Sequence, residues 1–476
     1  MSETEEIVNS TKWFNEVGTD ETPSRLSGFV YFLVCAMPVF SAIAFGAVDT
    51  WALGVLALFA GLIMIFWLTD AFFKKEMRFN SNALQIPLLA LILIGLIQLL
   101  PLRPSGVSAD LLSVPAATSL SLAPYYTRLA VVQLIIYFIF FAAALVFINN
   151  PKRLRISALT IIIFGAIMAF FGITQRLANP EAIYGFRPPG QAIPFASFIN
   201  QHHFAAYMEM TIGLTLGLLF GRSAEKQKKL LLIIAAVLMG IAILLTGSRG
   251  GLLSFLGVLG FILTANLLER RKKGEDSETA ESVYRRNFAF IAGGLALILG
   301  LFGAVILLGS DESLLRGVGL TNTQDFSTGR THFWQIAVKI FLDYPILGAG
   351  LDAFGTAFTR YDSWSGIFRV EQAHNDYLQI LADAGIFGFA CVAAFIYLLF
   401  RRSLQVIEKT TNHFRRDVAI GALAGCFGIL IHSFFDFPLR TPSNALFFLT
   451  LTVLSTVSII YPKSNRKEGR KKAVDW

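Results

Sequence analysis

Long apolar stretches separated by short polar segments make up almost the whole chain. An α-helix needs about 20 apolar residues to cross the hydrocarbon core of a bilayer. Twelve such stretches occur, at 28–48, 51–69, 83–101, 128–148, 156–176, 203–220, 229–246, 249–268, 288–309, 378–400, 417–436 and 443–461. The pattern therefore predicts an all-α polytopic membrane protein with about 12 transmembrane helices.

The composition agrees with a lipid environment. Of the 476 residues, 55% are hydrophobic and only 15% are charged, which is too much apolar surface for one water-soluble core. The three cysteines, Cys35, Cys391 and Cys426, all fall inside predicted spans. We therefore expect neither disulfides nor a structural zinc site.

Basic residues gather in the connections that follow every second predicted span. These connections contain KKEMR, PKRLR, RSAEKQKK, ERRKKGEDSETAESVYRR, RRSLQVIEKTTNHFRR and the final KSNRKEGRKK. The positive-inside rule assigns all of them, and both termini, to the cytoplasm. The net charge of +8 is thereby explained without nucleic-acid binding. The first residues lack a basic segment and a cleavage site, so they are interpreted as a retained cytoplasmic tail.

This topology divides the chain into five predicted parts. They are a cytoplasmic tail (1–27), spans one to nine (28–309), a large extracytoplasmic loop (310–377), spans ten to twelve (378–462) and a basic cytoplasmic tail (463–476). Two shorter outer loops, 102–127 and 177–202, are rich in Pro, Ser and Gly. They are suited to pack over a site.

The large loop contains a predicted amphipathic helix within STGRTHFWQIAVKIFLDYP. Ser327 or Thr328 is the expected cap, and Pro345 ends the helix. The expected apolar stripe consists of Trp334, Ala337, Val338 and Phe341. A helix of this kind lies on the membrane surface or over a cavity.

Arginine dominates the positive charge on the predicted outer face. Of 40 basic residues, 29 fall on the cytoplasmic side, and ten of the other 11 are arginines. Selection against positive charge outside explains why these residues are few but not why they are arginines. The planar guanidinium binds phosphate or carboxylate through two parallel hydrogen bonds. The bias predicts recognition of an anion.

Two arginines stand at predicted helix starts. In TGSRGG (246–251), Ser248 is placed as an N-cap and Arg249 in the first turn of span eight. A helix N-terminus disfavours a cation but attracts an anion, so the motif predicts a phosphate site completed by Arg249. An arginine that extends to lipid headgroups is the alternative. In STGRTHFW, Arg330 begins the loop helix beside His332 and Trp334, and a solvated arginine is the alternative there.

The segment FINQHHFAAYMEM places Asn200, His202 and His203 at the start of span six, with Glu209 about two turns inside. A carboxylate in the membrane is costly, so Glu209 should pair or line a polar cavity. Adjacent histidines lack the i, i+4 spacing of a zinc site, so no metal is expected. Hydrogen bonding of Asn200 and His203 to neighbouring loops is the structural interpretation.

A further polar cluster stands at the start of span ten, in EQAHNDYLQ. Glu371 and His374 are one helical turn apart, and His374 would share a face with Leu378 and Leu381. Neutral imidazole is suited to take a proton from a hydroxyl group, with Asn375 or a carboxylate to orient it. HSFFDFPLRTPSN places four polar residues at the outer ends of spans eleven and twelve: His432, Asp436, Arg440 and Asn444.

Together these motifs resemble the O-antigen ligase/polymerase superfamily of bacterial envelope glycosyltransferases. The matching segments are NQHHFAAY (200–207), TGSRGG (246–251), STGRTHFW (327–334), AHNDYLQILADAGIFG (373–388) and HSFFDFPL (432–439). The resemblance covers about the C-terminal two thirds of the chain. It implies an inner-membrane enzyme that moves a glycan from undecaprenyl pyrophosphate to an acceptor hydroxyl at the periplasmic face. It also implies inversion at the anomeric carbon, with no metal and no cofactor.

The resemblance also implies roles for individual residues. Arg249 and Arg330 would hold the donor pyrophosphate, and His374 would activate the acceptor hydroxyl. Four residues would support the site: Asn200, His203, Asn375 and Asp436. The acceptor could be lipid A core, a growing polysaccharide or a protein hydroxyl, and a ligase is favoured over a polymerase or a protein O-oligosaccharyltransferase.

A membrane transporter or lipid flippase is the alternative from another class. Such proteins place ionisable residues near the middle of the bilayer, as Glu209 and Asp383 are placed here. However, most polar clusters lie toward one face, the connection between spans six and seven is short, and no internal repeat is evident. The sequence therefore favours the enzyme.

Overall fold

The computed structural model covers most of the chain between the first and last predicted spans. It describes residues 14–16, 24–103, 118–178, 182–188, 190, 192–272, 285, 329–363 and 370–459. Several sequence predictions lie outside these residues. They concern most of the tail 1–27, the middle of the loop 102–127, the span 288–309, residues 310–328 with the cap Ser327 or Thr328, and the tail 463–476.

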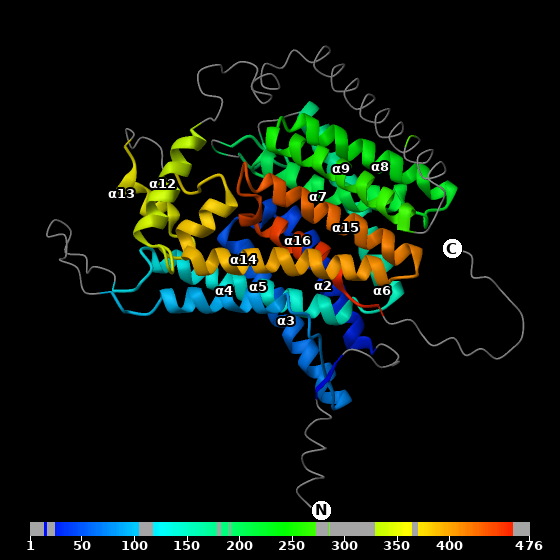
Figure 1. Ribbon diagram of the computed structural model, residues 1–476, viewed down its shortest axis with the longest axis horizontal. Helices are drawn as coiled ribbons and strands as arrows, with labels where there is room; N and C mark the ends of the chain where they lie inside the picture. The colour runs from blue at the N-terminus through cyan, green and yellow to red at the C-terminus, as the bar shows by residue number, and fades with distance from the viewer. Residues whose placement is uncertain are drawn as a thin grey trace, which may run out of the picture.

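Helices account for nearly all of the regular structure in the described residues (Figure 1). Before the gap at 286–328 these are α2 (Arg25–Ile43), α3 (Thr50–Lys74), α4 (Gln85–Gln98), α5 (Pro124–Phe147), α6 (Pro151–Ala178), α7 (Gln201–Phe220), α8 (Lys226–Leu245) and α9 (Arg249–Lys272). After it come α12 (Arg330–Asp343), α13 (Phe354–Tyr361), α14 (Asp376–Lys409), α15 (His413–His432) and α16 (Pro442–Thr456). Short 3₁₀ turns are η2 (Phe45–Ala47) and η3 (Pro438–Arg440), and the strands β1 (Phe14–Glu16) and β2 (Met77–Phe79) pair in parallel.

Eight of the described helices are long and apolar enough to cross a membrane by length and composition. They are α2, α3, α5, α6, α7, α8, α9 and α14, while α4 and α16 are shorter apolar helices. The chain is thus an all-α polytopic membrane protein, as predicted. Eleven of the twelve predicted spans overlap a helix. Because the remaining one lies outside the described residues, the count of twelve stays a prediction.

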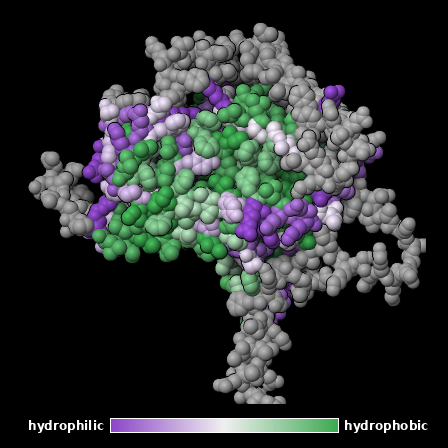
Figure 2. Space-filling model, viewed as in Figure 1, coloured by the Kyte–Doolittle hydropathy of each residue, from purple (hydrophilic) through white to green (hydrophobic). Residues whose placement is uncertain are grey.

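The outer surface has the polarity expected of a protein in lipid. On α3, Leu58, Ile65 and Phe72 each expose more than half of their surface. On the face in Figure 2, an apolar area covers the helices. Hydrophilic residues gather at the end where α12 and α13 lie and at the C-terminal end of α14. Lipid tails would contact the apolar area between these two ends.

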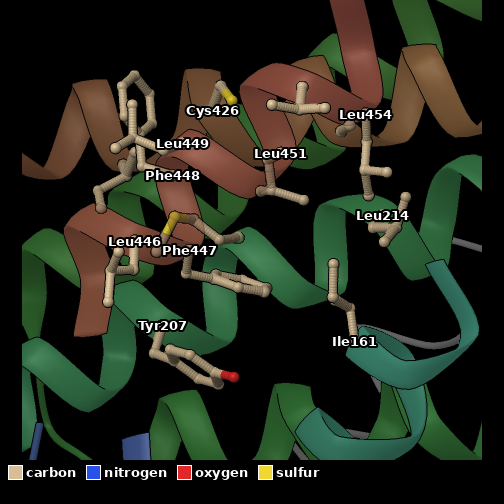
Figure 3. Packing of buried hydrophobic residues seen from close by; sticks show 14 of the residues in the cluster. Ile161, Tyr207, Leu214, Cys426, Leu446, Phe447, Phe448, Leu449, Leu451 and Leu454 are labelled. Atoms are coloured by element: carbon tan, nitrogen blue, oxygen red, sulfur yellow. The ribbon is translucent and has the colours of Figure 1, made fainter. Parts of the chain in front are cut away.

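The centre of the molecule is built around α7, whose side chains are almost all buried. It approaches α15 closely because glycines face each other, and a Cβ added to Gly213 would lie 2.5 Å from the backbone nitrogen of Gly425. Small residues at helix crossings are typical of membrane helix packing. On its other side Tyr207 stacks on Phe447 of α16, with ring centroids 4.6 Å apart (Figure 3). This packing fixes the three helices that border the site.

The segment between α12 and α13 is attached to a kink in α14. Gly385 has φ +63° and interrupts the helical hydrogen bonds of α14. The freed carbonyl oxygens of Ala382 and Asp383 accept hydrogen bonds from the backbone N–H groups of Ala349 (2.8 Å) and Gly350 (3.0 Å). The part of the chain that follows α12 is thereby held against the membrane helices. The segment GAGLDA (348–353) therefore forms a turn against α14.

The face of α12 that packs on protein is not the predicted apolar stripe. The helix begins at Arg330 and ends before Pro345 as expected, but its buried side chains are Ile336, Ala337 and Ile340. These pack with α13 and the start of α14, whereas Val338 is 43% exposed. The stripe through 333, 336, 337 and 340 is as apolar as the predicted one, so the local pattern does not distinguish the two. The observed stripe faces protein because α13 offers an apolar surface.

Candidate functional site

Three of the predicted site residues meet in a network of hydrogen bonds and charges. Asp436 lies between α15 and α16 and is only 1% exposed. One of its carboxylate oxygens lies 3.1 Å from Nδ1 of His374, and the other lies 3.6 Å from the guanidinium of Arg330. A buried carboxylate needs such partners. The three residues come from the start of α14, the start of α12 and the segment before α16.

His374 is held in place by the residue that follows it. Asn375 caps α14, because its side-chain oxygen accepts hydrogen bonds from the backbone N–H groups of Tyr377 and Leu378. Its side-chain amide also donates to the carbonyl oxygen of Phe434, at 3.0 Å. Asn375 thus ties the start of α14 to the segment that carries Asp436. The hydrogen bonds of Asn375 go to the backbone, and its supporting role stays a prediction.

The helical phase predicted for His374 is wrong. His374 precedes α14 and has φ +51°, so it lies one turn from neither Glu371 nor Leu378 in a helix. Because Asn375 is the N-cap, regular helix begins only at Asp376. The left-handed backbone at position 374 directs the imidazole to Asp436 instead of along the face of α14.

The surroundings of Asp436 keep its carboxylate ionised. Burial alone would raise the pKa of Asp436, but the hydrogen bond and charge of His374, followed by the nearby His202 and His203, hold this pKa well below its usual value. An ionised Asp436 accepts a hydrogen bond from Nδ1–H of His374, which leaves Nε2 of the imidazole with a lone pair. The side chain of His374 is 29% exposed, so a substrate can reach it.

Aromatic side chains surround this imidazole. Phe437 lies edge-on to both His374 and His203, with centroid distances of 4.8 Å to each. The ring of Phe333 is 5.9 Å from that of His374, and the indole N–H of Trp334 donates to the backbone oxygen of His374 at 3.4 Å. The rings restrict the imidazole to one orientation. Phe437 was not predicted as a site residue, although it lies within the HSFFDFPL motif.

His203 bonds to a neighbouring segment, as the structural interpretation expected, whereas Asn200 bonds within its own helix start. Asn200 caps α7 by accepting a hydrogen bond from the N–H of His202. Nδ1 of His203 lies 2.7 Å from the hydroxyl of Thr441, and Asn444 donates to the carbonyl oxygen of His203. These contacts join the start of α7 to the start of α16.

Two buried polar atoms at the site remain without hydrogen-bond partners in the described part of the chain. They are Nε2 of His203 and the second carboxylate oxygen of Asp436, which has only the 3.6 Å ion pair with Arg330. Buried polar atoms are usually satisfied by protein, water or a ligand. The site therefore offers hydrogen-bonding capacity that the surrounding residues do not use.

Arg249 lies at the start of α9, where it was predicted. The hydroxyl of Ser248 accepts a hydrogen bond from the N–H of Gly251 at 3.1 Å, which confirms the N-cap. The side chain of Arg249 is exposed. The next residue, Gly250, lies against His432 and Phe435. Phe435 immediately precedes Asp436 in the chain. The helix start that carries Arg249 thus borders the segment that carries Asp436.

The remaining polar residues of the outer clusters are paired elsewhere. Arg440 forms ion pairs with Asp352 and with the buried Asp383, and His332 lies 3.0 Å from Asp362. Glu209, which was expected to pair, lies 3.0 Å from Nδ1 of His432. The two intramembrane carboxylates that favoured a transporter, Glu209 and Asp383, are therefore each occupied by a cationic or imidazole partner.

A comparison with known families supports the enzyme class. Residues 234–393 match the family model described as O-antigen ligase. This confirms the resemblance to the O-antigen ligase/polymerase superfamily that the motifs indicated. The O-antigen ligase match extends from α8 into α14, so it includes Arg249, Arg330 and His374 but not Asp436. No match was found among curated proteins.

Proposed function

We propose that this O-antigen ligase-like protein moves a glycan from undecaprenyl pyrophosphate to an acceptor hydroxyl at the periplasmic face of the bacterial inner membrane. The observation that carries the proposal is the meeting of His374, Asp436 and Arg330, a base with an orienting carboxylate beside a cation. The two termini are cytoplasmic in this proposal. It assigns no step to a metal ion or a cofactor.

His374 is the proposed general base. With Nδ1–H bonded to Asp436, Nε2 takes the proton of the acceptor hydroxyl while the hydroxyl oxygen attacks the anomeric carbon of the donor. The bond between that carbon and the phosphate oxygen breaks, and undecaprenyl pyrophosphate leaves from the opposite side. Direct attack inverts the configuration at the anomeric carbon. Asp436 stabilises the imidazolium that forms, as a buried carboxylate does in other His–Asp pairs.

Arg330 and Arg249 are the proposed binding residues for the pyrophosphate. As the glycan leaves, negative charge builds on the phosphate oxygens, and a guanidinium already in place stabilises that charge. Arg330 retains donor capacity because its contact with Asp436 is a single long one of 3.6 Å. Arg249 adds its charge to the positive end of the α9 helix dipole.

The acceptor distinguishes a ligase from its relatives, and we propose lipid A core. A polymerase would use a second carrier-linked repeat, and a protein O-oligosaccharyltransferase would use a serine or threonine. All three share the base and the donor site. The transporter alternative loses support because Glu209 and Asp383 are both paired and buried.

Envelope glycans of a strain that lacks the protein test the proposal. Loss of the lipopolysaccharide ladder with accumulation of carrier-linked long chains supports a ligase, whereas single carrier-linked repeats indicate a polymerase. Unchanged lipopolysaccharide with altered glycoproteins indicates a protein acceptor. If all envelope glycans and glycoproteins are unchanged, the proposed enzymatic function is contradicted.

The same strain tests the base. The His374→Ala variant should insert into the membrane at the wild-type level and fail to restore the glycans. His413→Ala is the matched control, because His413 is exposed at the opposite end of the helix pair α14–α15. Full restoration by His374→Ala contradicts its role.

A further inference from the structure

A buried carboxylate–imidazole pair lies beneath the first turn of α9. Glu209 of α7 is 0% exposed and His432 of α15 is 1% exposed. Nδ1 of His432 lies 3.0 Å and 3.2 Å from the two carboxylate oxygens of Glu209, so its N–H is shared between them. The proposed reaction uses neither residue. Removal of either partner would leave the other buried without its hydrogen bond and counter-charge. The pair therefore holds α7 and α15 together at this point.

The last two glycines of TGSRGG are explained by this pair. A Cβ added to Gly250 would lie 3.0 Å from Cδ2 and 3.1 Å from Nε2 of His432. A Cβ added to Gly251 would lie 3.0 Å from a carboxylate oxygen of Glu209 and 2.9 Å from Cβ of Ala205. Neither glycine has a positive φ, so space and not backbone conformation requires glycine there. Only a turn without side chains can approach the pair this closely.

The first turn of α9 is therefore held from both sides. On the inner side it lies on Glu209 and His432, and at its start Ser248 caps it through the N–H of Gly251. Ser254 donates to the carbonyl oxygen of Gly250 at 2.8 Å, which adds a constraint from the next turn. His432 also connects to the catalytic segment, because its carbonyl oxygen accepts from the N–H of Asp436 at 3.1 Å.

We propose that the Glu209–His432 pair is a positioning element of the donor site: it supports the first turn of α9 and thereby fixes Arg249 relative to Asp436 and the pyrophosphate. This inference rests on the proposed function, since Arg249 must bind the donor. Glu209 and His432 are positioning residues and not catalytic ones, because the first turn of α9 covers them. In this proposal the contact of the first turn of α9 with Glu209 and His432 serves donor binding.

The glycines provide the sharpest test, since their substitution lifts the turn without removing the pair. Gly251→Ala and Gly250→Ala should each raise the KM for the undecaprenyl-pyrophosphate-linked donor by about tenfold or more, because small displacements of a binding group are costly. The KM for the acceptor should stay unchanged. Gly260→Ala is the matched control on the same helix, because a Cβ there meets nothing within 4 Å. Equal donor KM values for Gly251→Ala and Gly260→Ala would overturn the proposal.

A double-mutant comparison separates this inference from the proposed function. If the glycine acts through Arg249, Gly251→Ala should raise the donor KM far less in an Arg249→Ala background than in the wild type. If Gly251→Ala raises the donor KM equally in the wild-type and Arg249→Ala backgrounds, the glycine does not act by positioning Arg249. If Arg249→Ala by itself leaves the donor KM unchanged, the proposed function of Arg249 fails instead.

Glu209→Gln tests the pair itself and distinguishes positioning from folding. Gln has the size of Glu and retains an oxygen that accepts the N–H of His432. The variant should accumulate in membranes and bind the acceptor normally, with a donor KM between those of wild type and Gly251→Ala. A lower maximal rate that is accounted for by a smaller amount of folded protein, with both KM values unchanged, would show that the pair serves stability alone.

Discussion

Nδ1 of His374 lies 3.1 Å from the carboxylate of Asp436, although the two residues are 62 positions apart in the chain. The contact gives the imidazole a fixed orientation and a fixed tautomer, with Nε2 as the acceptor. A carboxylate–imidazole pair of this kind is suited to proton abstraction near neutral pH. Its position beside Arg330 is the basis for the predictions on catalysis.

Asp436→Asn should lower the rate of glycan transfer by about 10²- to 10⁴-fold, the range attributed to general acid–base catalysis. The amide oxygen of Asn can still accept Nδ1–H, but the neutral amide cannot stabilise the charge of the imidazolium. Single-turnover transfer with purified protein and a saturating donor measures the effect. Asp362→Asn is the control, because Asp362 pairs with His332 away from the base. Similar rates for the two variants would contradict the proposed role of Asp436.

Arg249→Lys should fail almost as completely as Arg249→Ala. Lysine keeps the charge but cannot form two parallel hydrogen bonds with a phosphate. Donor binding to purified protein, measured with a fluorescent undecaprenyl-pyrophosphate glycan, tests this expectation. Arg128→Lys is a suitable control, because Arg128 is an exposed arginine at the start of α5. Wild-type affinity in Arg249→Lys would show that charge alone is sufficient.

The sequence predicted the helices well because apolar length is a local property. It could not predict that Asp436 meets His374, or that Glu209 meets His432, since these pairs join residues 62 and 223 positions apart. The wrong helical phase predicted for His374 could, however, have been avoided from the local sequence. Asn375 has the short polar side chain preferred at N-caps, so a helix start at Asp376 could have been recognised. The stripe of α12 depended on α13, whose position no local pattern reveals.

The depressed pKa of Asp436 makes the stability contribution of this carboxylate depend on pH. Its folded-state pKa lies below its unfolded value of about 3.9, so the contribution is fully present above that value and is lost as the pH falls through the folded-state pKa. Asp436→Asn should therefore lower the Tm in detergent at pH 5, by an amount that corresponds to about 2 kcal/mol. The difference between variant and wild type should shrink toward pH 2. A difference that is constant over this range would contradict the ionised carboxylate.

Gly348→Ala should destabilise the attachment of the α12–α13 segment to α14. Gly348 has φ +72°, and an added Cβ would overlap the backbone of Asp383 at the α14 kink. A left-handed conformation alone costs a non-glycine residue about 1–3 kcal/mol, and the overlap adds to that. Hydrogen exchange should accelerate at the N–H groups of Ala349 and Gly350, which bond to α14. Gly61→Ala in α3, where a Cβ meets nothing within 4 Å, is the control. Unchanged exchange in Gly348→Ala would show that the segment is held by its other contacts, such as the packing of Ile336 and Ile340.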